Sequence, residues 1–236
     1  MNAAVEQSAT LEPRPVERRA RPRGTHPLAA LSPELVSAHF PASGPAESLR
    51  ELRSQLLLRW FTEHRTLAVI GAHDEDGADV VAANIAIAMA QLGESTLLID
   101  ANLREPRQHQ LFGLRPIVGL SALLQNRDVH VEAVQPVPAV AHLHVLCAGS
   151  LPTNPQELVS RTPLIYLLKT LPERFRAVIV ATPPALAYAD AQIIAARARG
   201  CVLVTRRHRT RVADVARVKS QLEPAQAVLL GAVIRE

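Results

Sequence analysis

The chain has 236 residues, of which 48% are hydrophobic and 20% charged, and its formal net charge is +4. This length suits one mid-sized globular domain with some tail and excludes a mini-protein. Lys169 and Lys219 are the only lysines, so the basic charge comes almost entirely from arginine. The two cysteines, Cys147 and Cys201, lie in apolar runs, which argues against a disulfide framework and favours a reducing compartment, the cytoplasm.

No apolar run approaches the roughly 18 residues of a membrane span, and the polar N-terminus does not resemble a secretory signal. Residues 1–45 contain seven prolines and no sustained periodicity, which predicts a disordered tail. The arginines between residues 14 and 23 could meet an anionic partner or membrane surface, but nearby glutamates nearly cancel their charge. The folded domain is therefore expected over residues 46–236.

Apolar residues recur at helical spacing from Leu49 to Trp60, which predicts a helix after the tail. Short apolar runs then alternate with helical patterns. Strands are expected over residues 66–72, 95–100, 142–148, 177–181, 201–205 and 227–234. Helices are expected over residues 80–92, 155–171, 189–199 and 212–222. This alternation predicts right-handed crossovers and a doubly wound, three-layer α/β/α domain with a mostly parallel sheet.

In such a sheet the first strand–helix turn is the usual phosphate site. The turn contains Ala72, Gly77, Ala78, Asp79 and Val80. A nucleotide-binding loop would have Gly-Lys-Ser or Gly-Lys-Thr at positions 77–79, with the lysine on the phosphates and the hydroxyl on magnesium. Here the second and third positions are alanine and aspartate, and no earlier lysine exists to replace the missing one.

Carboxylates at positions 74, 75, 76 and 79 give this turn a negative lining. Each would oppose a phosphate charge by about 3 kcal/mol at an effective dielectric near 20, before screening by salt. Their spacing does not match a calcium-binding EF-hand loop, so no metal site is expected. We interpret the turn as an exposed acidic cap, with Asp79 accepting N–H bonds at the start of the next helix.

Several separated segments resemble the cytoplasmic domain of the bacterial tyrosine kinases (BY-kinases) of capsule and exopolysaccharide synthesis, especially the chain-length-determinant kinases of the EpsG type. The matching segments are residues 82–84, 92–109, 148–158 and 182–184, together with Asp190. The resemblance covers about residues 46–236. It implies a P-loop NTPase fold of the MinD and ParA kind.

The sequence departs from this family at the positions that perform its chemistry. The phosphate-loop lysine and hydroxyl correspond to Ala78 and Asp79. The family's Asp-x-Asp motif keeps Asp100 but has Asn102, and the aspartate expected at the end of a later strand is Ala181, the Walker B position. Since magnesium prefers several oxygen ligands, the resemblance leaves Asp100 and Asn102 as remnants and no assigned catalytic residue.

The resemblance also implies a C-terminal tail whose tyrosines are phosphorylated. This sequence does not show such a tail. Its tyrosines, Tyr166 and Tyr188, are interpreted as packing residues. The family's Glu-x-x-Arg-x-x-Arg oligomerisation motif matches Glu47, Arg50 and Arg53, which helical spacing places along one flank. An ordinary solvated helix face remains the alternative interpretation of these three residues.

The densest basic run spans residues 206–211, at the end of an expected strand. It could contact phosphates, an acidic partner loop or anionic lipid, or simply face solvent. No aromatic residues interleave with these arginines, so nucleic acid is not the expected partner.

The resemblance and its departures favour a degenerate kinase-like regulator or scaffold of exopolysaccharide biosynthesis, export and chain-length control. It would act with a membrane chain-length-determinant or export protein, as a homo-oligomer or in mixed oligomers with an intact kinase, located in the cytoplasm or peripherally at the inner membrane. No cofactor is expected on this hypothesis. The alternative is an active tyrosine autokinase that uses ATP and magnesium, and a more remote one is a partitioning ATPase relative of the MinD or ParA type.

Overall fold

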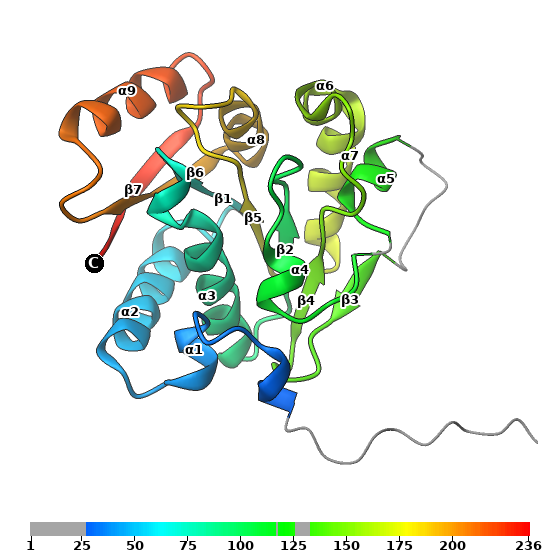
Figure 1. Cartoon of the computed structure of the whole chain (residues 1–236), viewed down its shortest axis with the longest axis vertical. Helices are drawn as coiled ribbons and strands as arrows, with labels where there is room; N and C mark the ends of the chain where they lie inside the picture. Colours follow the sequence, from blue (N-terminus) through cyan, green and yellow to red (C-terminus); the bar gives the residue numbers. More distant parts are fainter. Residues whose placement is uncertain (1–26, 117, 126–132) are drawn as a thin grey trace, which may run out of the picture.

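The computed structural model describes residues 27–116, 118–125 and 133–236. Within these residues the strands form one seven-stranded sheet in the order β3-β4-β2-β5-β1-β6-β7 (Figure 1). All neighbouring strands are parallel except β3 and β4, which are antiparallel. The strands are β1 (Thr66–Gly71), β2 (Thr96–Asp100), β3 (Val134–Pro136), β4 (Leu143–Leu146), β5 (Ala177–Ala181), β6 (Gly200–Arg206) and β7 (Val228–Arg235).

This sheet confirms the predicted doubly wound, mostly parallel architecture. Six strands lie within one or two residues of their predicted bounds because each is an apolar run between turn residues. The sequence did not predict β3, which has only three residues, ends in Pro136 and pairs on one side alone. A proline is tolerated in an edge strand because its missing N–H weakens no ladder on the outer side.

Helices cover both faces of the sheet. On one face lie the short η1 (Pro27–Ala30) and α1 (Val36–His39), then α2 (Gly44–Arg59), α3 (Ala78–Gln91) and α4 (Gln108–Leu111). On the other face lie α5 (Leu120–Gln125), α6 (Pro155–Ser160), α7 (Thr162–Thr170), η3 (Leu171–Glu173), α8 (Asp190–Ala198) and α9 (Val212–Leu222). None of the helices in the described part of the chain combines the length and apolarity that crossing a bilayer requires.

The structure differs from the predicted tail between residues 27 and 43, which pack against the domain. Leu35 is 0% exposed and Leu31 is 6% exposed, and both belong to the core beneath α2 and α3. The Asn84 side chain on α3 accepts a hydrogen bond from the Ser37 N–H at 2.9 Å and donates to the Glu34 carbonyl at 3.1 Å. Leucines at a four-residue spacing supply the buried face, and a polar composition hid this signal. Residues 1–26, with their arginines, lie outside the described part of the chain.

The single helix predicted over residues 155–171 is instead divided. Helix α6 ends at Ser160, Arg161 is extended with φ −76° and ψ 162°, and α7 begins at Thr162. Pro163 follows at once, and a proline is favourable in the first turn of a helix but breaks a helix interior. The proline therefore starts a second helix at the point where it would have interrupted the first.

Candidate functional site at the carboxyl ends of the strands

The loop that joins β1 to α3 has the strand–turn–helix form of a phosphate loop. Ala72 is buried directly after β1, and the residues from Asp74 to Asp76 form a 3-10 turn, η2. Gly77 then adopts the left-handed region with φ 68°, and α3 begins at Ala78. A Cβ at Gly77 would overlap the guanidinium of Arg235 as well as being strained. This backbone conformation therefore favours glycine where the sequence places it.

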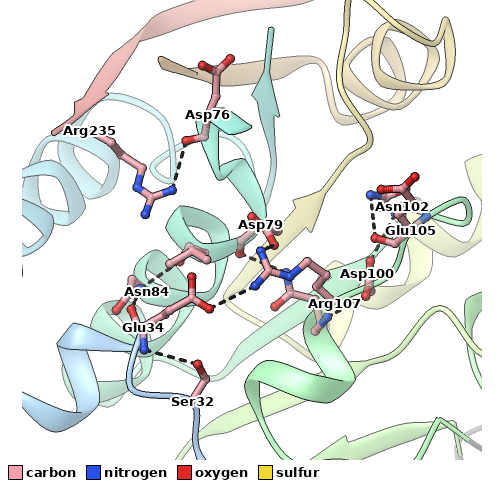
Figure 2. Close-up of polar contacts among 12 residues, drawn as sticks. Ser32, Glu34, Asp76, Asp79, Asn84, Asp100, Asn102, Glu105, Arg107 and Arg235 are labelled. Carbon is pink, nitrogen blue, oxygen red and sulfur yellow. Dashed lines mark hydrogen bonds and ion pairs between the residues drawn. The ribbon is translucent and has the colours of Figure 1, made fainter. Parts of the chain in front are cut away.

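Asp79 lies in the first turn of α3 and is bound by an arginine from another part of the chain. Nη1 of Arg107, in the segment between β2 and α4, donates to Oδ2 of Asp79 at 2.8 Å. Nη2 of Arg107 donates to Oε2 of Glu34 at 3.1 Å, so one guanidinium bridges two carboxylates (Figure 2). The side chains of Arg107 and Glu34 are each 43% exposed, so each pair contributes about 1 kcal/mol or less.

This arrangement differs from the expected helix cap. The carboxylate of Asp79 accepts from Arg107, and in the described part of the chain it accepts from no backbone N–H of α3. The guanidinium of Arg107 gives Asp79 a charge-assisted hydrogen bond, which is stronger than a hydrogen bond from a neutral backbone amide. Val80, the next residue, is buried against the sheet.

Asp76 lies on the opposite side of the loop and is fully buried. Its carboxylate accepts hydrogen bonds from the His73 N–H, at 2.8 Å, and from the Thr210 hydroxyl. Nη1 of Arg235, at the end of β7, donates to the Asp76 carbonyl at 3.3 Å (Figure 2). The loop is therefore held by the segment after β6 and by the last strand.

Asp100 ends β2 and is buried beside the loop. Its carboxylate accepts from the Asn102 N–H at 3.3 Å and from the Gln108 N–H at 2.9 Å. Burial raises the pKa of Asp100 from 3.8 to about 7, although these two hydrogen bonds oppose the shift. Its register partner on β5 is Ala181, which offers a methyl group where the resemblance implies a carboxylate.

The side chain of Asn102 organises the segment after β2. It accepts from the backbone N–H groups of Arg104, at 3.2 Å, and of Glu105, at 3.0 Å. It also donates to the carbonyl of Glu105 at 2.9 Å (Figure 2). The oxygen and nitrogen of this amide are thus both engaged within the turn.

A second ion pair crosses the same edge of the sheet and was not predicted. Nε and Nη2 of Arg104 donate to the two carboxylate oxygens of Asp190 at 2.9 and 3.1 Å. The Arg104 guanidinium carbon also lies 4.0 Å from the centre of the Tyr188 ring. Asp190 is buried, so this bidentate pair fixes the position of Arg104.

Two cavities flank the loop. The cavity between Gly71, Asp79, Asn102, Arg107 and Thr182 has a volume of about 20 Å³. This is close to the space that a single water molecule needs. A larger cavity of about 370 Å³ lies beside it, and its lining includes Asp74, Glu75, Arg104, Glu105, Tyr188 and Asp214. In the described residues, no group of three His, Cys, Asp or Glu side chains could hold a metal ion.

The flank predicted from Glu47, Arg50 and Arg53 is divided in the structure. Glu47 and Arg50 form an ion pair on α2. Nη1 of Arg53 instead donates to the Ala88 carbonyl at 3.2 Å, near the end of α3. Arg53 is therefore committed to packing between α2 and α3, and the first two residues of the motif remain at the surface.

The tyrosines have different surroundings. Tyr166 is 69% exposed on α7, so its interpretation as a packing residue was wrong. The hydrophobic helix pattern suggested burial, but the tyrosine lies on the solvent side of that helix. Tyr188 is 36% exposed and packs under the guanidinium of Arg104.

Comparisons with known proteins identify the family. No family model matches the chain. Tyrosine-protein kinase YwqD of Bacillus subtilis is 35% identical over 201 residues, which cover 85% of this chain and 84% of YwqD. The chain belongs to the bacterial tyrosine kinase family. Tyrosine-protein kinase etk of Escherichia coli is 31% identical over 82% of this chain, but the match spans only 27% of that longer protein.

Solved structures agree with this family membership. The kinase domain of Escherichia coli tyrosine kinase ETK has a TM-score of 0.84 at 29% identity, covering 93% of this chain and 85% of that domain. The septum site-determining protein MinD of Pyrococcus horikoshii has a TM-score of 0.61 at 19% identity, which shows the shared fold alone. The P-loop NTPase fold of the MinD kind is thus confirmed for this bacterial tyrosine kinase relative.

Proposed function

We propose that the chain is a degenerate member of the bacterial tyrosine kinase family that neither holds Mg-ATP nor transfers phosphate. The observation that carries this proposal is the ion pair between Arg107 and Asp79. It lies at the first turn of α3, where the family resemblance implies a hydroxyl that binds magnesium next to a lysine that binds phosphate. In this chain, position 79 has a carboxylate that is ion-paired with Arg107 in place of the hydroxyl, and position 78 has an alanine in place of the lysine.

Electrostatics support this proposal. Ala78 supplies no charge, and the guanidinium of Arg107, which lies beside Asp79, is shared between Asp79 and Glu34. Releasing Arg107 to a phosphate would expose two carboxylates, each opposing a phosphate charge by about 3 kcal/mol before screening. The cavity of about 20 Å³ at this point has the size of one water molecule, and Asp74, Glu75, Glu105 and Asp214 give the larger cavity beside it a negative lining.

The donor set does not fit magnesium either. Magnesium binds through carboxylates, hydroxyls and retained waters in near-octahedral geometry. Ala181 has no donor atom, and the amide of Asn102 is engaged by its own turn. Asp100 remains, but burial raises its pKa to about 7, which disfavours the charged form that a metal would need.

By resemblance, the chain would act in exopolysaccharide or capsule synthesis as a scaffold or regulator of export and chain length. Its partner would be a membrane chain-length-determinant protein, which would bring the chain to the inner membrane as a peripheral component. Homo-oligomers, or mixed oligomers with an intact kinase, would use the flank of α2 that carries the exposed Glu47 and the half-buried Arg50. On this proposal, the chain's surfaces carry the function that its loop no longer performs.

An active autokinase is the second candidate, favoured by 35% identity to tyrosine-protein kinase YwqD and by the retained Asp100. Incubation of the full chain with labelled ATP and magnesium separates the two candidates, with the ETK kinase domain as the positive control. We expect no label on any tyrosine of the chain, whether the chain is a monomer or a homodimer. Incorporation into Tyr166 or Tyr188 that depends on magnesium would establish the autokinase instead.

A further inference from the structure

Two exposed patches of opposite charge lie at the edge of the sheet where the strands end. The first, which we call the acidic patch, comes from the loop before α3 and from the turn after β2. It consists of Asp74, Glu75 and Glu105. The second, which we call the basic loop, joins β6 to α9. Its exposed arginines are Arg206, Arg207, Arg209 and Arg211. The edge therefore presents both signs of charge within one surface.

The two patches are neighbours through buried contacts. The Thr210 hydroxyl, in the basic loop, donates to the buried carboxylate of Asp76. Nε2 of His73 lies 3.3 Å from Oδ2 of Asp214, in the first turn of α9, and this contact lowers the pKa of Asp214. These contacts fix the relative positions of the acidic patch and the basic loop.

The acidic patch and the basic loop nevertheless form no ion pair within 4.0 Å with each other in the described residues. The one ion pair of the basic loop is that of Arg207 with Glu236, at 3.6 Å, and both side chains are largely exposed. The charges of both patches are thus open to a group from outside the molecule.

The acidic patch also borders the cavity of about 370 Å³, which is in the size range of sites that accept a ligand or an inserted side chain. The lining contains two arginines, Arg104 and Arg217. The charge of Arg104 is matched by the buried Asp190. Carboxylates therefore predominate around this opening, which favours a cationic side chain as its occupant.

We propose that this edge is an interface between two copies of the chain, in which the basic loop of each copy enters the acidic cavity of the other. A two-fold interface requires one surface that contains both a patch and its complement side by side. Arginine suits this role because its planar fork binds carboxylates with two parallel hydrogen bonds. A nucleic acid or anionic membrane would use the basic loop alone and would be repelled by the adjacent acidic patch.

Sedimentation velocity of the full chain tests this proposal. All variants carry Arg50→Glu, which is chosen to disrupt the proposed association through the Glu47 and Arg50 flank of α2. At about 0.05 M NaCl this background chain is expected to form dimers, and at about 0.5 M NaCl screening should return it to monomers. Arg207→Glu with Arg209→Glu, or Asp74→Arg with Glu75→Arg, should each weaken self-association about tenfold or more. An equimolar mixture of these two variants should dimerise again, because the reversed patches are complementary.

Arg59→Glu with Arg197→Glu is the matched control for the arginine variant, since it lowers the net charge by the same amount at exposed arginines outside this edge. It should associate like the background chain. A background chain that stays monomeric at low salt, or a mixture that fails to associate, overturns the proposal. Sedimentation measures the mass of the particle, so this test of the interface does not depend on nucleotide binding or phosphate transfer.

Discussion

At the scale of single residues, two arginines contact the loop before α3 from opposite sides. Arg107 binds Asp79, and Arg235 lies against Gly77 and the Asp76 carbonyl. Both come from segments far away in the sequence and both bring a charge that the loop itself lacks. The carboxylates of Asp79 and Asp76 are bound by protein groups, whereas Asp74 and Glu75 are exposed to solvent. This explains how four acidic residues can occupy a turn that forms a phosphate site in related folds.

Restoring the loop chemistry should therefore restore affinity for nucleotide. In the variant Ala78→Lys with Asp79→Ser, a cation is gained, one carboxylate is removed and Arg107 is released. We expect Mg-ATP to bind about tenfold or more tightly than to the parent chain, as measured by isothermal titration calorimetry. The matched control, Ala78→Gln with Asp79→Ser, has a long side chain without the charge. Equal affinities for the two variants would show that the missing cation is not what limits binding.

The buried Asp100 should make stability depend on pH. Its folded-state pKa is about 7 against an ordinary value of 3.8, so within this window the folded chain retains a proton that the unfolded chain has lost. The contribution of Asp100 to stability therefore falls as the pH rises through the window and is constant above it. Asp100→Asn cannot titrate. The unfolding free energy of the parent minus that of this variant should decrease from about pH 4.5 to about pH 7.5.

Urea denaturation at the two pH values measures this difference. Subtracting the variant cancels the titration of every other group that the two chains share. A difference that is constant, or that grows with pH, would mean that Asp100 is charged in the folded protein across this range.

At the scale of elements, the N-terminal segment is the main departure from the sequence prediction. Its prolines and polar residues resemble a linker, but Leu31 and Leu35 bury one face against α2 and α3. Glu34 then reaches Arg107, which connects this segment to the loop before α3. The segment between residues 27 and 43 is thus part of the domain and part of the site.

Truncating Leu35 should show this packing. Leu35 is 0% exposed, so Leu35→Ala should lower the free energy of unfolding by about 2–5 kcal/mol through lost burial and a cavity. Leu58→Ala makes the same chemical change at a leucine that is 72% exposed on α2, and it should cost about 0.5 kcal/mol or less. Similar losses in the two variants, measured by denaturant unfolding, would show that the segment does not pack as described.

At the scale of the whole molecule, local sequence patterns were sufficient to predict the architecture of the sheet and its helices. Apolar runs located six strands, and their alternation with helices predicted parallel pairing and the edge at which loops gather. The edge strand β3 escaped because three residues show no periodicity. The interactions of the site depend on contacts across long separations. Arg107 and Glu34 are 73 residues apart, and Arg104 and Asp190 are 86 residues apart, so no local spacing could indicate either pair.

Calorimetric titration of the full-length parent chain with Mg-ATP and Mg-ADP tests the central claim most directly. The ion-paired Asp79, the uncharged Ala78 and the small cavity beside them predict no heat of binding up to concentrations of about 1 mM. The ETK kinase domain serves as the binding control in the same buffer. A dissociation constant near 1 μM for the parent chain would contradict the claim and restore the loop to nucleotide chemistry.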